Sequence, residues 1–140
     1  MEIKVKKIDA RAKLPSYAHP GDAGLDVYAL DDVTIPPGER KTIATGIALA
    51  IPDGYVALVW DKGGLAFKFG LKSLGGVLDA GYRGELVVCL LNTSQESFTF
   101  KSGEKVAQLL IQSVERAILN EVNELDSTPR ADGRWGSTGK

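Results

Sequence analysis

The chain has 140 residues, of which 44% are hydrophobic and 25% are charged, and its formal net charge at pH 7 is −1. This length suits one domain with its own core, and the composition is typical of a globular protein rather than a disordered, fibrous or membrane-spanning one. A chain so close to neutral has no basic field for polymeric DNA or RNA, although a local cluster of cations can hold a small anion.

The only cysteine is Cys89 and the only histidine is His19. A single cysteine forms no internal disulfide, and the two residues cannot build a Cys/His zinc site. We interpret Cys89, inside the run LVVCLL, as a small core hydrophobe, and His19 as a loop residue. The chain begins with charged residues, and no window approaches the length of a membrane span. We therefore expect a cytoplasmic protein that does not bind membranes.

Turn signals separate short apolar and β-branched runs along the chain, which predicts a compact all-β domain. These signals are HPGDAG, PPGE, PDG and SGE. The runs between them are rich in the strand-forming residues Val, Ile, Tyr and Phe. In chain order, strands are predicted over residues 2–8, 24–30, 41–51, 55–60, 84–92 and 97–100.

Two stretches are harder to assign. In residues 104–119 (EKVAQLLIQSVERAIL), the apolar positions also fit the spacing of a helix. We predict a strand there, because the surrounding chain is β and its strands need partners. Residues 60–70 (WDKGGLAFKFG) are predicted to hold one helical turn after the glycines, with backbone amides that can face an anion.

The most suggestive internal stretch covers residues 75–85 (GGVLDAGYRGE). Val77 and Leu78 are predicted to lie in a strand that enters a turn, with Asp79 and Tyr82 close together at its tip. One interpretation is an ordinary hairpin whose aspartate caps backbone amides. The alternative makes Asp79 a general base and Tyr82 a platform for a flat or sugar-like ligand.

Other polar residues could form the second half of a ligand site. These are Lys62 in DKGGLA, Gln108 in KVAQLL, and Arg130 and Arg134 in the final stretch RADGRWGSTGK. Each alone is equally well explained as a commonplace surface or half-buried residue. The glycine-rich final stretch has little to bury, so it is either a loose tail or is ordered by something outside its own core.

Five stretches resemble, in order and spacing, the five motifs of the trimeric dUTP diphosphatase (dUTPase) family. They are residues 20–27 (PGDAGLDV), 61–70 (DKGGLAFKFG), 75–85 (GGVLDAGYRGE), 103–110 (GEKVAQLL) and 130–139 (RADGRWGSTG). The resemblance implies a homotrimer of jelly-roll-like β subunits with active sites shared between subunits, which hydrolyses dUTP to dUMP and pyrophosphate with Mg²⁺. It also implies a β domain over residues 1–129 and a flexible C-terminal motif, residues 130–140, that closes over the substrate.

The resemblance assigns roles to the internal hairpin. Asp79 matches the carboxylate that positions and deprotonates the water attacking the α-phosphorus, a role typically worth ~10²- to 10⁴-fold in rate. Tyr82 matches the aromatic residue under the deoxyribose, where a ribose 2′-hydroxyl would collide with the ring. The backbone around Val77 and Leu78, with Ser73 nearby, is similar to the uracil slot, in which the amino group of cytosine would face a donor.

The phosphates are expected to meet a second set of residues. By the same resemblance, this set is Lys62 with Gly63 and Gly64, Gln108 and Arg130. Mg²⁺ is expected to be held by phosphate oxygens and waters, without a direct protein ligand.

The remaining assignments concern the first and last motifs. Asp26 is either an outer-shell group for Mg²⁺ or a purely structural residue. Trp135 stands where the family usually has a phenylalanine that stacks on the uracil. Gly136, Ser137 and Thr138 are then expected to wrap the γ-phosphate.

The second motif departs from the family pattern, which usually reads Arg-Ser-Gly or Arg-Ser-Ser and here reads Lys62-Gly63-Gly64. Lysine lacks the bidentate fork of arginine. Gly63 lacks a hydroxyl whose transition-state hydrogen bond would be worth ~1.5–3 kcal/mol, roughly ten- to a hundredfold in rate. We therefore expect a dUTPase slowed by Gly63. One alternative is a catalytically impaired dUTP-binding homologue that acts as a sensor or partner-binding protein. Another is a dCTP deaminase-type relative, although no stretch resembles the segment that carries the deaminase glutamate.

Overall fold

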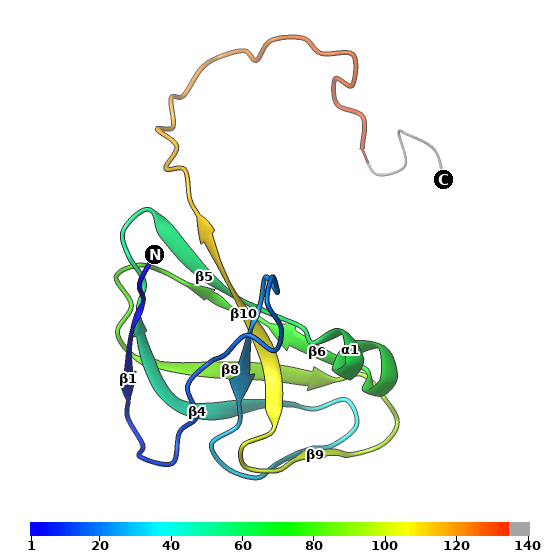
Figure 1. Cartoon of the computed structure of the whole chain (residues 1–140). Coiled ribbons are helices and arrows are strands. Elements are labelled where there is room, and N and C mark those ends of the chain that lie inside the picture. Colours follow the sequence, from blue (N-terminus) through cyan, green and yellow to red (C-terminus); the bar gives the residue numbers. More distant parts are fainter. Residues whose placement is uncertain (135–140) are drawn as a thin grey trace.

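The computed structural model describes residues 1–134, which form a jelly-roll-like β-sandwich followed by an extended segment (Figure 1). The elements in chain order are β1 (Lys4–Lys7), β2 (Leu25–Tyr28), β3 (Val33–Ile35), β4 (Arg40–Ala50), β5 (Tyr55–Trp60), α1 (Gly63–Phe69), β6 (Leu71–Leu74), β7 (Val77–Leu78), β8 (Glu85–Asn92), β9 (Phe98–Phe100) and β10 (Lys105–Ser113). The predicted all-β class is confirmed.

The strands form two four-stranded antiparallel sheets and one short two-stranded ribbon. The first sheet has the order β1-β4-β8-β6, the second has the order β2-β10-β5-β7, and β3 pairs with β9. The chain passes from the first sheet to the second between β6 and β7, through Gly75 and Gly76. This crossing leads directly into β7 and the turn that carries Asp79.

Alternation along β8 shows how the sandwich core is built. Leu86, Val88 and Leu90 point inward and are at most 2% exposed, whereas Val87 lies on the outer face and is 44% exposed. Cys89 shares that outer face and is only half-buried. Its prediction as a core residue is wrong, because the period of two places it opposite the core.

The stretch with ambiguous spacing forms a strand. β10 pairs with β2 on one side and with β5 on the other, so its residues lie in the middle of the second sheet. The prediction of a strand is confirmed for residues 105–113, and residues 114–134 form no helix or strand. Tertiary pairing settles what periodicity alone leaves open.

The other predicted strands agree with the structure to within a few residues at each end. Two short strands, β3 and β6, are missing from the prediction. They have three and four residues, which is too short for a clear alternation of apolar and polar positions. The helix α1 begins at Gly63, rather than after the glycines as predicted.

The segment after β10 leads away from the sandwich (Figure 1). The Val114 amide still donates to the Gly54 carbonyl oxygen at 2.9 Å, and Arg116 pairs with Asp53 at 3.0 Å. Beyond them, Ile118 and Leu119 are 96% and 93% exposed. No helix among residues 1–134 is long and apolar enough to cross a membrane.

Candidate active site

β7 pairs with β5, whereas β8 pairs with β4 and β6, so the predicted hairpin over residues 75–85 is a turn that joins the two sheets. This turn, for which we keep the name hairpin, borders an open cavity of about 280 Å³. Val77, Leu78, Asp79 and Tyr82 all line it, as do outward-facing residues of β8. The Tyr82 amide donates to the Asp79 carbonyl oxygen at 3.0 Å, which closes the turn. The Tyr82 hydroxyl donates to the Glu85 carbonyl oxygen at 3.1 Å, which fixes the ring beside the cavity. The structure thus brings these four predicted residues together.

Glu85 is a second carboxylate on this cavity, and its contacts are structural. Its Oε1 accepts the Gly46 amide at 2.7 Å, at an irregularity in the pairing of β4 with β8. Gly46 has φ +70°, and a Cβ there would lie 2.9 Å from that of Ala12. Because Glu85 already caps this tight bulge, Asp79 is the carboxylate of this cavity that is exposed to solvent.

Lys62 and Gln108 line a different cavity, of about 510 Å³, together with Asp26 and Trp60. Asp26 is 4% exposed, and its two carboxylate oxygens pair with Lys62 Nζ at 2.5 Å and with Lys105 Nζ at 2.6 Å. Burial raises the pKa of Asp26, but the hydrogen bonds and charges of Lys105 and Lys62 outweigh it, so the net shift is downward. The same pairing raises the pKa of Lys105.

Lys62 also marks the start of α1. Its backbone is extended, and its carbonyl oxygen accepts the first helical hydrogen bond, from the Ala66 amide at 2.9 Å. Gly63 and Gly64 follow as exposed residues of the first turn. A Cβ at Gly63 would meet only the Phe67 ring, at 3.8 Å, and one at Gly64 would meet nothing within 4 Å. Neither position therefore needs glycine for steric reasons.

Gln108 supports the segment that carries Lys62. Its Nε2 donates to the Asp61 carbonyl oxygen at 2.7 Å. A Cβ at Gly24 would lie 2.6 Å from Gln108 Oε1, so this glycine lets β2 approach the amide closely. The Asp61 carboxylate accepts from the Ser73 amide at 2.6 Å and from Lys72 Nζ at 2.8 Å.

Ser73 lies beside the hairpin cavity rather than in it. It is 9% exposed and borders a smaller hollow that Gly76 and Val77 also line. Its amide is already bonded to Asp61. Ser73 was predicted to lie near the uracil slot, and the structure places it in β6, the strand before the crossing that leads to Val77.

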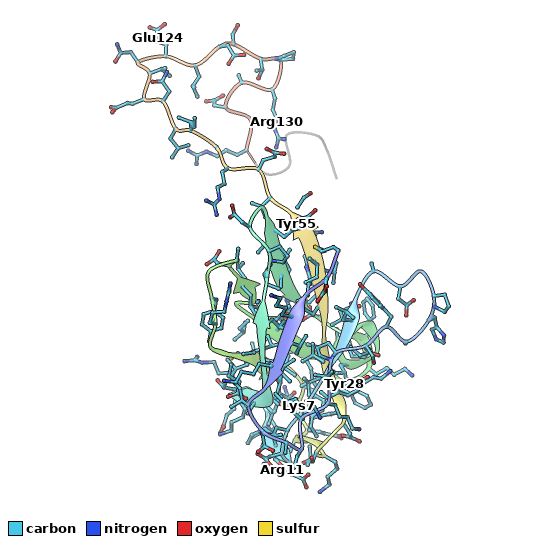
Figure 2. The ribbon with its side chains drawn as sticks, turned by 60° about the vertical axis from the view of Figure 1, so that its left-hand side comes forward. Lys7, Arg11, Tyr28, Tyr55, Glu124 and Arg130 are labelled. Atoms are coloured by element: carbon cyan, nitrogen blue, oxygen red, sulfur yellow. The ribbon has the colours of Figure 1, made fainter. Side chains whose placement is uncertain are left out.

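Arg130 lies in the extended C-terminal segment, away from the sandwich (Figure 2). Its Nε donates to the Gly133 carbonyl oxygen at 3.4 Å, a contact within the segment itself. Trp135, Gly136, Ser137 and Thr138 lie outside the described residues.

The predicted site residues therefore fall into three separate groups on one chain. The hairpin group contains Asp79 and Tyr82, the second group contains Lys62 and Gln108, and Arg130 belongs to the C-terminal segment. Sequence reasoning missed Lys105 and Asp61. The only sequence signal for these two residues is their position within the motif stretches, Lys105 in GEK and Asp61 in DKGG.

Comparisons with known proteins agree with this architecture. The family model described as dUTPase matches residues 10–139. A deoxyuridine 5′-triphosphate nucleotidohydrolase from Thermobifida fusca is 47% identical over 99% of this chain and 79% of its own length. Another from Clostridium kluyveri is 46% identical over 99% of both chains.

Solved structures show the same similarity. The dUTPase of Staphylococcus bacteriophage 80alpha with dUpNHpp superposes with a TM-score of 0.93 at 28% identity, over 99% of each chain. A mutant dUTPase from phage phi11 of S. aureus, described with a structural Mg(II) ion, has a TM-score of 0.83 at 27% identity and covers 89% of this chain and 98% of its own. By its sequence and its fold, the chain belongs to the dUTPase family.

Proposed function

We propose that this protein hydrolyses dUTP to dUMP and pyrophosphate. The observation that carries the proposal is that Val77, Leu78, Asp79 and Tyr82 all line one cavity. Asp79 acts as the general base. Its carboxylate accepts a proton from the water that attacks the α-phosphorus and fixes the direction of attack.

Base and sugar selection follows from the same hairpin. Val77 is 66% exposed and Leu78 is 9% exposed, so the two-residue strand offers one outer and one inner side chain beside its backbone groups. Backbone donors and acceptors can match uracil and leave the amino group of cytosine facing a donor. The Tyr82 ring, 47% exposed and anchored through its hydroxyl, provides a flat surface for the deoxyribose.

The phosphates are bound by Lys62 and Gln108 from one subunit and by the C-terminal motif, starting at Arg130, from another. This division supports a homotrimer with shared active sites, because the groups lie apart on one chain. The C-terminal segment also carries exposed apolar side chains that contact with a neighbouring subunit would bury, namely Ile118, Leu119 and Leu125. Light scattering should give about three times the chain mass of 15.0 kDa. A stable monomer with full activity would contradict this assembly.

We propose that Mg²⁺ reaches the site with the triphosphate. Among residues 1–134, no group of three or more His, Cys, Asp or Glu side chains is placed to hold a metal ion. Both oxygens of Asp26 are paired with lysines, which limits this residue to the outer shell at most. Mg²⁺ commonly keeps its waters and binds through substrate phosphates, and there it would neutralise charge on the triphosphate. A single, half-buried cysteine suits the reducing cytoplasm.

The experiment that tests this function measures pyrophosphate release from dUTP, dCTP, dTTP and UTP with Mg²⁺. We expect selective cleavage of dUTP, and a loss of ~10²- to 10⁴-fold in Asp79→Asn. The alternative, a dUTP-binding homologue with little turnover, is favoured by one observation, the glycine at position 63. It predicts that dUTP binds but is cleaved only after Gly63→Ser.

A further inference from the structure

Asp61 is hydrogen-bonded both to the proposed phosphate-binding part of the chain and to the strand that precedes the proposed uracil-binding backbone. It follows the end of β5 and immediately precedes Lys62. Its backbone carbonyl is held by Gln108 Nε2 at 2.7 Å, on the side of the phosphate-binding residues. Its side chain points to the other part and accepts the Ser73 amide in β6 at 2.6 Å. Asp61 therefore contacts both Gln108, beside the proposed phosphate-binding residues, and Ser73, in the strand that leads to the proposed uracil-binding backbone.

The carboxylate of Asp61 is well held. Its side chain is 21% exposed, and Lys72 Nζ donates to its second oxygen at 2.8 Å. Burial raises the pKa of Asp61, but the hydrogen bonds from Lys72 and Ser73 outweigh it, so the group is ionised at neutral pH. A charged acceptor makes a stronger bond to the Ser73 amide than a neutral one.

The Ser73 amide lies just before the crossing from β6 to β7. Besides the pairing of β6 with β8 and of β7 with β5, two hydrogen bonds tie this crossing to β5 and to the residue that follows it. The first is the bond from Ser73 to Asp61, and the second is the bond from the Val59 amide to the Gly76 carbonyl oxygen at 2.8 Å. A Cβ at Gly76 would lie 2.9 Å from Val59 Cβ, so the two segments are in close contact. The next residue is Val77, where the proposed uracil-binding backbone begins.

We infer that Asp61 is a positioning residue for base recognition, which acts through the Ser73 amide to fix the hairpin backbone at Val77 and Leu78. The inference rests on the proposed dUTP hydrolysis. Without the Asp61 side chain, the crossing keeps the bond at Gly76, the pairing of β6 with β8 and the pairing of β7 with β5, but Ser73 is no longer tied to the residue that follows β5. The backbone just before Val77 is then less firmly fixed. Base discrimination depends on fixed donors and acceptors, so it is the property expected to suffer first.

The test compares Asp61→Ala with Asp61→Asn, and Lys72→Met serves as the matched control. Asn keeps an acceptor for the Ser73 amide and Ala does not. Lys72→Met removes the ion pair with Asp61 and the 3.4 Å bond from Nζ to Ser73 Oγ, but leaves the bond from the Ser73 amide to Asp61. For each variant, kcat and KM are measured with dUTP and dCTP, and thermal unfolding is followed by circular dichroism. We expect Asp61→Ala to raise the KM for dUTP and lower the dUTP/dCTP ratio of kcat/KM, each by roughly tenfold. Asp61→Asn and Lys72→Met should stay within about threefold of the unaltered protein.

Three results would overturn the inference. These are unchanged discrimination in Asp61→Ala, equal losses in Asp61→Asn and Asp61→Ala, or equal losses for dUTP and dCTP that follow the fall in Tm. If the unaltered protein does not cleave dUTP at all, the proposed function fails, and this outcome is visible before any variant is compared.

Discussion

The Nζ of Lys62 lies against the buried carboxylate of Asp26, so the cation before α1 is already held by β2. Lys105 of β10 holds the other oxygen of the same carboxylate. One negative charge thus orients two positive ones. Asp22 lines the same cavity and acts on Lys105, so the four side chains together carry no net formal charge.

Asp26→Asn should destabilise the fold by ~1–3 kcal/mol at pH 7, because it removes the buried charge that both lysines contact. The pKa of Asp26 is lowered in the folded state. Its contribution is therefore complete above the unfolded pKa near 3.8 and is lost as the pH falls through the folded value. Urea unfolding from pH 3 to pH 7 should show a shallower acid dependence in Asp26→Asn. The exposed Asp53, changed to Asn, is the control and should change the free energy of unfolding little. An Asp26→Asn curve parallel to that of the unaltered protein would count against this linkage.

Gly63→Ser should raise kcat for dUTP by roughly ten- to a hundredfold, because it restores a hydroxyl donor at the phosphates. The side chain fits, since its Cβ meets only the Phe67 ring at ordinary contact distance. Gly63→Ala is the matched control, because it adds the same Cβ and also favours the helix over glycine, but it carries no hydroxyl. The measurement is the rate of pyrophosphate release under saturating dUTP, which gives kcat for each variant. An equal gain in both variants would point to helix stability rather than to a phosphate contact.

Sequence patterns predicted most strands because the core is built by alternation, as in β8, and because glycines mark the turns. They failed for β6, which is a four-residue strand defined by its partner β8 and not by its own pattern. They also placed Cys89 in the core, because LVVCLL is apolar on both faces and does not show which face is inside.

The candidate site was predictable only in part. The proximity of Asp79 and Tyr82 follows from one short turn, so the local sequence is enough to predict it. The contacts of Asp61 with Ser73 and Gln108 join three elements. No local pattern predicts such contacts, because they depend on how the two sheets are placed in space.

The two adjacent glycines of the crossing should respond differently to alanine. Gly75 has φ +71° and open space around its missing Cβ, so Gly75→Ala should cost only the backbone strain of ~1–2 kcal/mol. Gly76 has φ +107° and a Cβ that would lie 2.9 Å from Val59 Cβ and 3.0 Å from the Val59 carbonyl oxygen. Gly76→Ala should therefore cost a further ~1–3 kcal/mol from overpacking. Urea unfolding of both variants measures the difference, and equal costs would show that the crossing moves freely away from β5.

Deletion of residues 130–140 should leave the β domain intact and nearly abolish turnover. The described hydrogen bonds of Arg130 and Ala131 remain within the C-terminal segment, so the sandwich loses no bond from them. The Tm and the number of subunits given by light scattering should therefore match those of the full chain. Turnover should fall because Arg130 and the residues that follow it are the proposed cover of the triphosphate, and their loss admits water and removes cationic charge.

Arg130→Ala separates these two effects, because it removes the charge and keeps the rest of the segment. A small loss in Arg130→Ala with a large loss in the deletion would assign the effect to closure of the site. Full activity in the deletion would show that the segment is not part of the catalytic machinery.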